Sequence, residues 1–155
     1  MTDVIRRPTL FLPILAAALL SLGCANAFAC TCALPSRNLS VKQQVNDARK
    51  RSKAVFSGQV LEITAAPDSN HIVVKLRVER TWKNIRGEEV LIVTGRGGGD
   101  CGYRFTVGAT YLVYAYGTDD TSLGTNICQR TAKFREALAD VKILGRGRPP
   151  LKAKM

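Results

Sequence analysis

Histidine is almost absent from this sequence, which removes the commonest metal ligand and general base. His71 is the only histidine among 155 residues. The sequence also has no Ser/His/Asp set, no paired-carboxylate motif and no cluster with the ligand spacing of a zinc site. We therefore predict that the protein is not an enzyme, and we assign it no catalytic residue and no cofactor.

Acidic residues are also scarce. Twelve aspartates and glutamates stand against 23 lysines and arginines, so the formal net charge is +11. Such an excess is compatible with an anionic polysaccharide, a membrane surface or a nucleic acid as partner, and charge alone does not choose among them. We interpret it as the basic surface of a soluble secreted or periplasmic protein, and we expect no nucleic-acid partner.

The one marked apolar run is too short to span a membrane. Residues 10–22 are almost wholly apolar, but Pro13 interrupts them, and a hydrocarbon layer of about 30 Å needs a longer helix at 1.5 Å per residue. Arg6 and Arg7 precede the run and Ala27-Phe28-Ala29 follows it. This order is typical of a secretory signal peptide and its cleavage site.

Cleavage after Ala29 would define the ends of the folded domain. We predict that residues 1–29 are the signal peptide and that the exported chain begins at Cys30, with no membrane insertion afterwards. Lipid attachment at Cys24 stays open as an alternative. Residues 30–144 would form a single domain, and the basic, Gly/Pro-rich tail 145–155 is expected to be disordered.

Four of the five cysteines would remain after cleavage: Cys30, Cys32, Cys101 and Cys128. An even number in an exported chain of this size indicates two disulfides, for which three pairings exist. A bridge between Cys30 and Cys32 would close a strained ring, so both are expected to reach distant partners. Loops of about 70 to 100 residues would each contribute roughly 4 to 5 kcal/mol.

Alternation of apolar and polar residues predicts a mainly β fold. Strands are expected over residues 54–64, 71–82, 89–94 and 110–116, with a last short strand within 121–127 and an extended segment at 103–105. Helical spacing predicts helices over 38–53, with Ser40 as N-cap, and over 130–143. Five short strands with two flanking helices favour a closed barrel of the oligonucleotide/oligosaccharide-binding type, because closure removes the sheet edges.

A series of motifs follows in a distinctive order. It runs from Cys30-Thr31-Cys32 through Phe56-x-Gly58-x-Val60 and Trp82-Lys83 to Cys101-Gly102-Tyr103-x-Phe105-x-x-Gly108-x-x-Tyr111-Leu112-Val113 and Cys128. The set resembles the N-terminal inhibitory domain of the tissue inhibitors of metalloproteinases, over essentially residues 30–144. The resemblance implies a netrin-like barrel, in agreement with the strand count. It also implies disulfides that join Cys30 to Cys101 and Cys32 to Cys128.

The resemblance further implies inhibition of a zinc metalloprotease. A catalytic zinc keeps three protein ligands and one position for water or substrate. In the family, the first cysteine displaces that water with its free α-amine and its own carbonyl oxygen. Carried over, Cys30 would be the ligand of the target's zinc. An α-amine with a pKa of about 7.7 to 8.0 lends its lone pair at little cost near neutral pH.

The same resemblance assigns the residues around the metal, which we call the inhibitory wedge: Cys30, Thr31, Cys32, Ala33, Gly99 and Asp100. Thr31 would enter the specificity pocket beside the zinc. Gly99 and Asp100 would flank the wedge, where an acidic side chain would face the glutamate of a protease. Two disulfides would keep this edge rigid, and a rigid edge loses little entropy on binding. The implied partner is a zinc metalloprotease, and the inhibitor is expected to be a monomer.

A second function fits the same fold. A binding module without inhibitory activity would engage an anionic glycan or an envelope protein through its basic surface. Its binding would be sensitive to salt and to neutralisation of the cluster Arg49, Lys50, Arg51 and Lys53. The two functions differ in one requirement, because only the inhibitor needs a free amine on Cys30.

Overall fold

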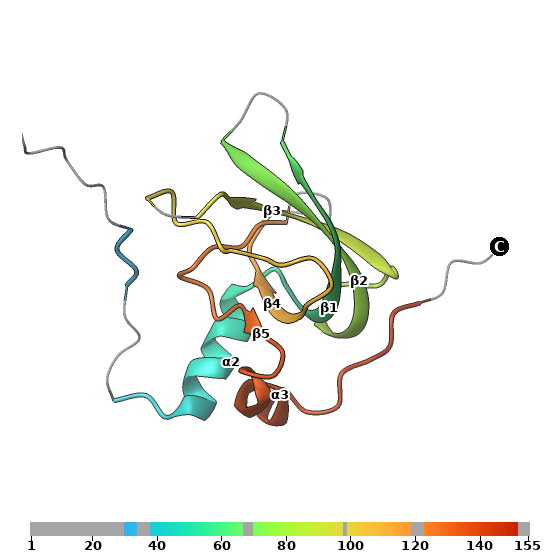
Figure 1. The fold of residues 1–155 in the computed structure, drawn as a ribbon. Helices are drawn as coiled ribbons and strands as arrows, with labels where there is room; N and C mark the ends of the chain where they lie inside the picture. Colours follow the sequence, from blue (N-terminus) through green and yellow to red (C-terminus); the bar gives the residue numbers. More distant parts are fainter. Residues whose placement is uncertain (1–29, 34–37, 67–69, 98, 119–122, 152–155) are drawn as a thin grey trace, which may run out of the picture.

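The computed structural model describes residues 30–33, 38–66, 70–97, 99–118 and 123–151. The expected signal peptide and Cys24 lie outside this part of the chain. The elements follow in the order α2 (Val41–Arg51), β1 (Ala54–Ala65), β2 (His71–Lys83), β3 (Glu89–Gly95), β4 (Thr110–Ala115), β5 (Ala132–Lys133) and α3 (Leu138–Leu144) (Figure 1). The fold is therefore mainly β with two helices, as the sequence predicted. Within the described residues, no helix is both long enough and apolar enough to cross a membrane.

The five strands form one antiparallel sheet with the order β3-β2-β1-β4-β5. The ladder begins at β3 and ends at β5, so the described strands do not close into the expected barrel. Isolated backbone bridges nevertheless join Gly124 to Val93 of β3 and to Tyr116, which follows β4. The chain after β4 thus returns to the free edge of β3 without forming a strand.

The long central strand β1 pairs with β2 on one side and β4 on the other. Gly58 allows β1 to approach β2 closely. A Cβ at this position would lie only 2.8 Å from the carbonyl oxygen of Arg77, so a larger residue would clash with β2. The principal core is made of buried side chains from β1 to β4, among them Phe56, Val60, Val74, Leu76, Ile92 and Tyr111. These residues include the alternating apolar positions from which the strands were predicted.

Helix α2 begins where the sequence predicted. The hydroxyl oxygen of Ser40 accepts a hydrogen bond from the backbone N–H of Gln43 (3.3 Å), and the Gln43 side chain accepts one from the N–H of Ser40 (2.8 Å). This reciprocal cap satisfies two donors that a helix start leaves unpaired. Val45 and Ala48 are buried in a second apolar cluster that also contains Leu112 and Tyr114 of β4. Both helices lie at the same end of the sheet (Figure 1).

The prediction of a helix over residues 130–143 is wrong for the first half of that range. Ala132–Lys133 form β5 instead, and the helix is confined to Leu138–Leu144. Thr131 accepts a hydrogen bond from the N–H of Tyr114 (3.0 Å), and Phe134 donates its N–H to Thr110 (2.9 Å). These bonds to β4 outweigh the helical spacing of the apolar residues. The strand expected within 121–127 is also not formed over residues 123–127, where only Gly124 bridges.

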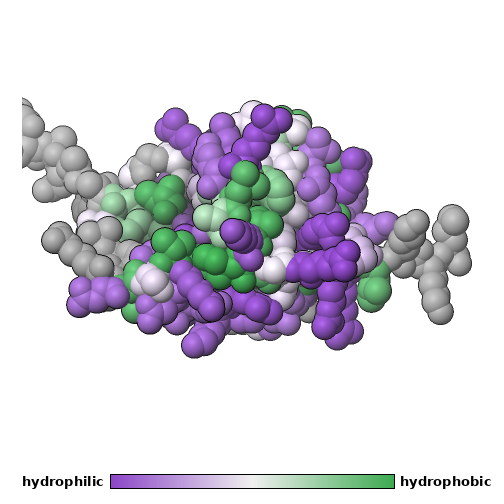
Figure 2. Space-filling model, turned by 90° about the horizontal axis from the view of Figure 1, so that it is seen from below, coloured by the Kyte–Doolittle hydropathy of each residue, from purple (hydrophilic) through white to green (hydrophobic). Residues whose placement is uncertain are grey.

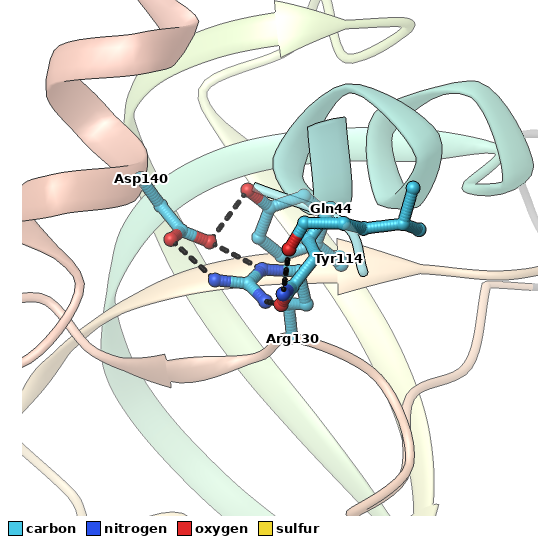
Figure 3. Close-up of polar contacts among 5 residues, drawn as sticks. Gln44, Tyr114, Arg130 and Asp140 are labelled. Atoms are coloured by element: carbon cyan, nitrogen blue, oxygen red, sulfur yellow. Dashed lines mark hydrogen bonds and ion pairs between the residues drawn. The ribbon is translucent and has the colours of Figure 1, made fainter. Parts of the chain in front are cut away.

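A partly buried polar network joins α2, β4 and α3 (Figure 3). The carboxylate of Asp140 accepts hydrogen bonds from the guanidinium of Arg130 (2.7 and 2.8 Å) and from the hydroxyl of Tyr114 (3.0 Å). Arg130 also donates to the side-chain oxygen of Gln44 (3.2 Å). Burial, together with the neighbouring Asp140 charge, raises the pKa of Tyr114 well above its ordinary value, so the phenol stays a donor.

The C-terminal segment 145–151 is bonded to β2, although its composition predicted disorder. Thr81 and Arg148 exchange both backbone hydrogen bonds (2.8 Å each), and Leu151 donates its N–H to Arg86 (2.7 Å). The indole N–H of Trp82 donates to the carbonyl of Gly145 (2.8 Å). The remaining residues of the predicted tail, 152–155, lie outside the described part.

Candidate functional site

Two disulfides hold the N-terminal segment 30–33 against distant parts of the chain. Cys30 pairs with Cys101 and Cys32 with Cys128, at Cα–Cα distances of 5.4 and 5.2 Å. Both distances lie in the normal range of about 4.4 to 6.8 Å. The two disulfides and their pairing are therefore those that the resemblance implied. The thiols of Cys30 and Cys32 are consumed in these bonds, so neither sulfur is available as a metal ligand.

Around its two anchors, the segment presents side chains to solvent. Thr31 and Ala33 are exposed, whereas Cys30 and Cys32 are half-buried. The segment has no regular secondary structure and lies at one edge of the molecule (Figure 1). Its alternate side chains thus face outward from a backbone fixed at two points.

The loop before Cys101 completes this edge, and Asp100 organises it. The Asp100 carboxylate accepts hydrogen bonds from the backbone N–H groups of Arg96 (2.7 Å), Gly97 (3.0 Å) and Gly102 (3.0 Å). These bonds, that from Gly102 foremost, hold the pKa of Asp100 below its usual value. The carboxylate thus bonds its own loop, an arrangement that the resemblance did not predict.

The Asp100 bonds give a test by pH titration. We expect the amide proton resonances of Arg96, Gly97 and Gly102 to titrate together in acid, with a midpoint below the ordinary aspartate pKa of about 3.9. Because the folded pKa is lowered, the stabilisation by this carboxylate is complete above about pH 4 and is lost as the pH falls through the lowered value. In Asp100→Asn this shared titration should disappear. Its persistence in that variant would mean that another group causes it.

Close backbone packing fixes the direction in which Cys101 points. Cys101 has a φ of 59°, a left-handed conformation uncommon for residues other than glycine. The next residue, Gly102, lies so near Gly95 that a Cβ there would come within 2.2 Å of the Gly95 carbonyl. The Cys101 carbonyl accepts a hydrogen bond from the N–H of Ile127 (3.0 Å), which ties this loop to the loop that carries Cys128.

Ile127 is an edge residue that the sequence interpretation missed. Its side chain is 47% exposed, although it is large and apolar, and its backbone is bonded to Cys101. A single exposed apolar side chain is common on protein surfaces, so Ile127 extends this edge without by itself marking a contact. The available signal in the sequence was that Ile127 directly precedes the disulfide-bonded Cys128.

The cations assigned to the alternative function lie at the end of α2. Arg49, Lys50 and Arg51 form its last turn, and Lys53 follows the helix. Arg49 donates to the carbonyl of Trp82 (3.2 Å), and Lys50 lies 3.8 Å from Asp47. The structure therefore brings these cations near the end of β2, and they belong to a surface other than the wedge residues.

A metal-binding cluster is not part of this site. Within the described ranges, no group of three or more histidine, cysteine, aspartate or glutamate side chains is placed to hold a metal ion. No known protein family matches the chain, and no curated protein matches it either.

Proposed function

We propose that the chain, once cleaved before Cys30, inhibits zinc metalloproteases. The observation that carries the proposal is the fixed N-terminal segment, in which disulfides at Cys30 and Cys32 hold the backbone while Thr31 and Ala33 stay exposed. A ligand that is already rigid before binding loses less conformational entropy when it enters a cleft. The geometry therefore supports an edge that docks without rearrangement.

The proposed chemistry uses backbone atoms of Cys30. After cleavage its α-amine is free, and amine nitrogen and carbonyl oxygen together form a bidentate ligand that displaces the water on the target's zinc. Only the neutral amine has a lone pair to give. With an α-amine pKa of about 7.7 to 8.0, inhibition is expected to strengthen as the pH rises from 6 to 8.

Thr31 follows the ligand directly and would enter the pocket next to the zinc. Its exposed hydroxyl and methyl group favour a target whose pocket accepts a small side chain. Asp100 supports this arrangement, because its carboxylate is held by three backbone N–H groups of its own loop. These bonds keep the carboxylate ionised and directed into its own loop, so Asp100 orders the edge, and a target must tolerate its negative charge.

The finer fold assignment belongs to the same proposal. We infer that the sheet is a netrin-like, oligosaccharide-binding type barrel whose closure passes through residues 123–125. Val93 donates to Leu123 (2.9 Å) and accepts from Thr125 (3.1 Å), while Gly124 and Tyr116 exchange both backbone bonds. These bonds bring the β3 edge to the chain that leaves β4. The protein is further proposed to be an exported, monomeric inhibitor, secreted or periplasmic.

The test compares two oxidised proteins that differ by one residue at the N-terminus. One begins at Cys30, and the other has a single alanine before it, which turns the amine into an amide. Against a panel of zinc metalloproteases, we expect the first to inhibit and the second to lose at least about 100-fold in affinity, or about 2.7 kcal/mol. Equal inhibition by both, or none by either while both are folded and oxidised, would contradict the proposal.

A further inference from the structure

A groove separate from the wedge residues runs between the end of α2, the end of β2 and the C-terminal segment. Its volume is about 610 Å³, and its walls include Trp82, Leu144 and Pro149. Volumes of about 300 to 1,000 Å³ are typical of small-molecule sites. Seen from the helix side, hydrophilic side chains surround an area of apolar surface on this molecule (Figure 2). The groove is thus large enough for a small ligand and combines apolar with charged walls.

Five cationic side chains line this groove, and its lining contains no acidic residue: Arg49, Lys83, Arg86, Arg146 and Arg148. Two of them already have structural roles. Lys83 donates to the carbonyls of Arg49 (2.9 Å) and Lys50 (3.0 Å) and to that of Ser52, which complements the negative end of α2. Arg49 donates to the carbonyl of Trp82. The other three have different surroundings.

The backbones of Arg86 and Arg148 are bonded to other segments, and the exposed side chains of Arg86, Arg146 and Arg148 have no acidic partner. The backbone of Arg148 pairs with Thr81, and the carbonyl of Arg86 accepts from Leu151. Across the described residues, no acidic side chain lies within 4.0 Å of these three guanidinium groups. The three exposed guanidinium groups line one groove, so an anion bound there can contact more than one of them.

Thr81 also lines the groove, but its hydroxyl oxygen is covered. The residue is only 8% exposed, and its Oγ1 is the one buried side-chain polar atom without a hydrogen-bond partner in the part of the chain that is described. Because this oxygen is fully covered, a ligand in the groove does not reach it, and the inference rests on the arginines and the apolar wall.

We infer that this groove binds a small ligand carrying at least two phosphate groups, either as a soluble molecule or as part of a lipid headgroup. Arginine suits phosphate because its planar guanidinium donates two parallel hydrogen bonds to two phosphate oxygens. Three uncompensated arginines on two separate segments favour more than one phosphate group. The apolar face of the groove accommodates the scaffold that carries them. The inference does not depend on inhibition by the wedge.

Trp82 supplies the readout, because it is the only tryptophan in the chain and lines the groove. The oxidised protein that begins at Cys30 would be titrated with inorganic pyrophosphate near neutral pH, by tryptophan fluorescence and by calorimetry. We expect a saturable fluorescence change and a stoichiometry of one. The double variant Arg146→Ala/Arg148→Ala should weaken binding at least tenfold, and its fold should persist because the bonds of this segment to β2 are made by backbone atoms.

A matched control removes the same charge elsewhere. Arg77 and Arg135 are exposed and do not line the groove, so Arg77→Ala/Arg135→Ala should leave the affinity within about twofold. Arg86→Ala tests the groove from a different segment and serves as the second variant if Arg146→Ala/Arg148→Ala does not fold. We expect it to weaken pyrophosphate binding at least threefold. Absence of saturable binding, or equal weakening by groove and control variants, would overturn the proposal.

Vesicles distinguish the two sources of phosphate. Vesicles that contain diphosphorylated lipid would be compared with phosphatidylcholine vesicles by co-sedimentation. If they bind and compete with pyrophosphate, the groove takes a lipid headgroup. If pyrophosphate binds and vesicles do not compete, it takes a soluble phosphate compound. Both results support phosphate binding in the groove. Vesicle binding that is unchanged in the Arg146→Ala/Arg148→Ala variant would argue against a phosphate site there.

Discussion

Asp140→Ala should lower the free energy of unfolding by about 3 kcal/mol, at the lower end of the range for breaking a buried ion pair. The Asp140 side chain is 8% exposed, and that of Arg130 is 30% exposed. Removing the carboxylate leaves the partly buried guanidinium of Arg130 without its counter-ion. It also removes the acceptor of the hydrogen bond from the Tyr114 hydroxyl. The contact of Arg130 with solvent reduces the penalty, which is why the lower value is expected.

Urea unfolding followed by Trp82 fluorescence and by circular dichroism would measure this loss. Asp47→Ala is the matched control, because Asp47 lies on α2, is 37% exposed and meets Lys50 at 3.8 Å. An exposed pair of this kind contributes no more than about 0.5 kcal/mol. If both variants lose the same small amount, the network of Figure 3 contributes little to stability.

The second large effect is expected from the disulfides. Replacing both Cys32 and Cys128 with alanine should lower the free energy of unfolding by about 4 kcal/mol, since the bond closes a separation of 96 residues. The Cys30 and Cys101 pair, with a separation of 71, should contribute slightly less. The loops overlap in sequence, so removal of both bonds should cost less than the sum.

Thiol labelling under denaturing conditions supplies the control for this experiment. A protein that begins at Cys30 should react at no thiol before reduction and at four after it. Each double alanine variant should still show no free thiol before reduction, which confirms that the remaining pair has formed. A free thiol in the unmodified protein, or no loss of stability in either variant, would contradict the disulfide assignment.

Local pattern predicted those elements whose stability is local. The Ser40 cap and the alternation along β1 to β4 correspond to the observed helix and strands. The prediction for the segment after Arg130 was wrong, because hydrogen bonds to Thr110 and Tyr114 outweigh the helical spacing of its apolar residues. Both partners lie far away in the sequence. Propensity does not report such distant bonds.

The two candidate sites were predictable to different degrees. Cysteine number and the motif order indicated where the N-terminal segment would be anchored, but not that the Asp100 carboxylate would bind its own loop. The groove was missed for a physical reason. Arg148 is held through its backbone, and backbone bonds to Thr81 form regardless of side-chain identity, so a Gly/Pro-rich basic composition predicted disorder instead.

The return of residues 123–125 to β3 also affects how the protein behaves at high concentration. A free sheet edge is a template for adding a strand from another molecule, and β3 carries the exposed apolar side chains Leu91 and Val93. Here the N–H and C=O groups of Val93 are already taken by Leu123 and Thr125. A crossing segment of three residues therefore blocks intermolecular strand addition at the place where apolar surface would otherwise promote aggregation.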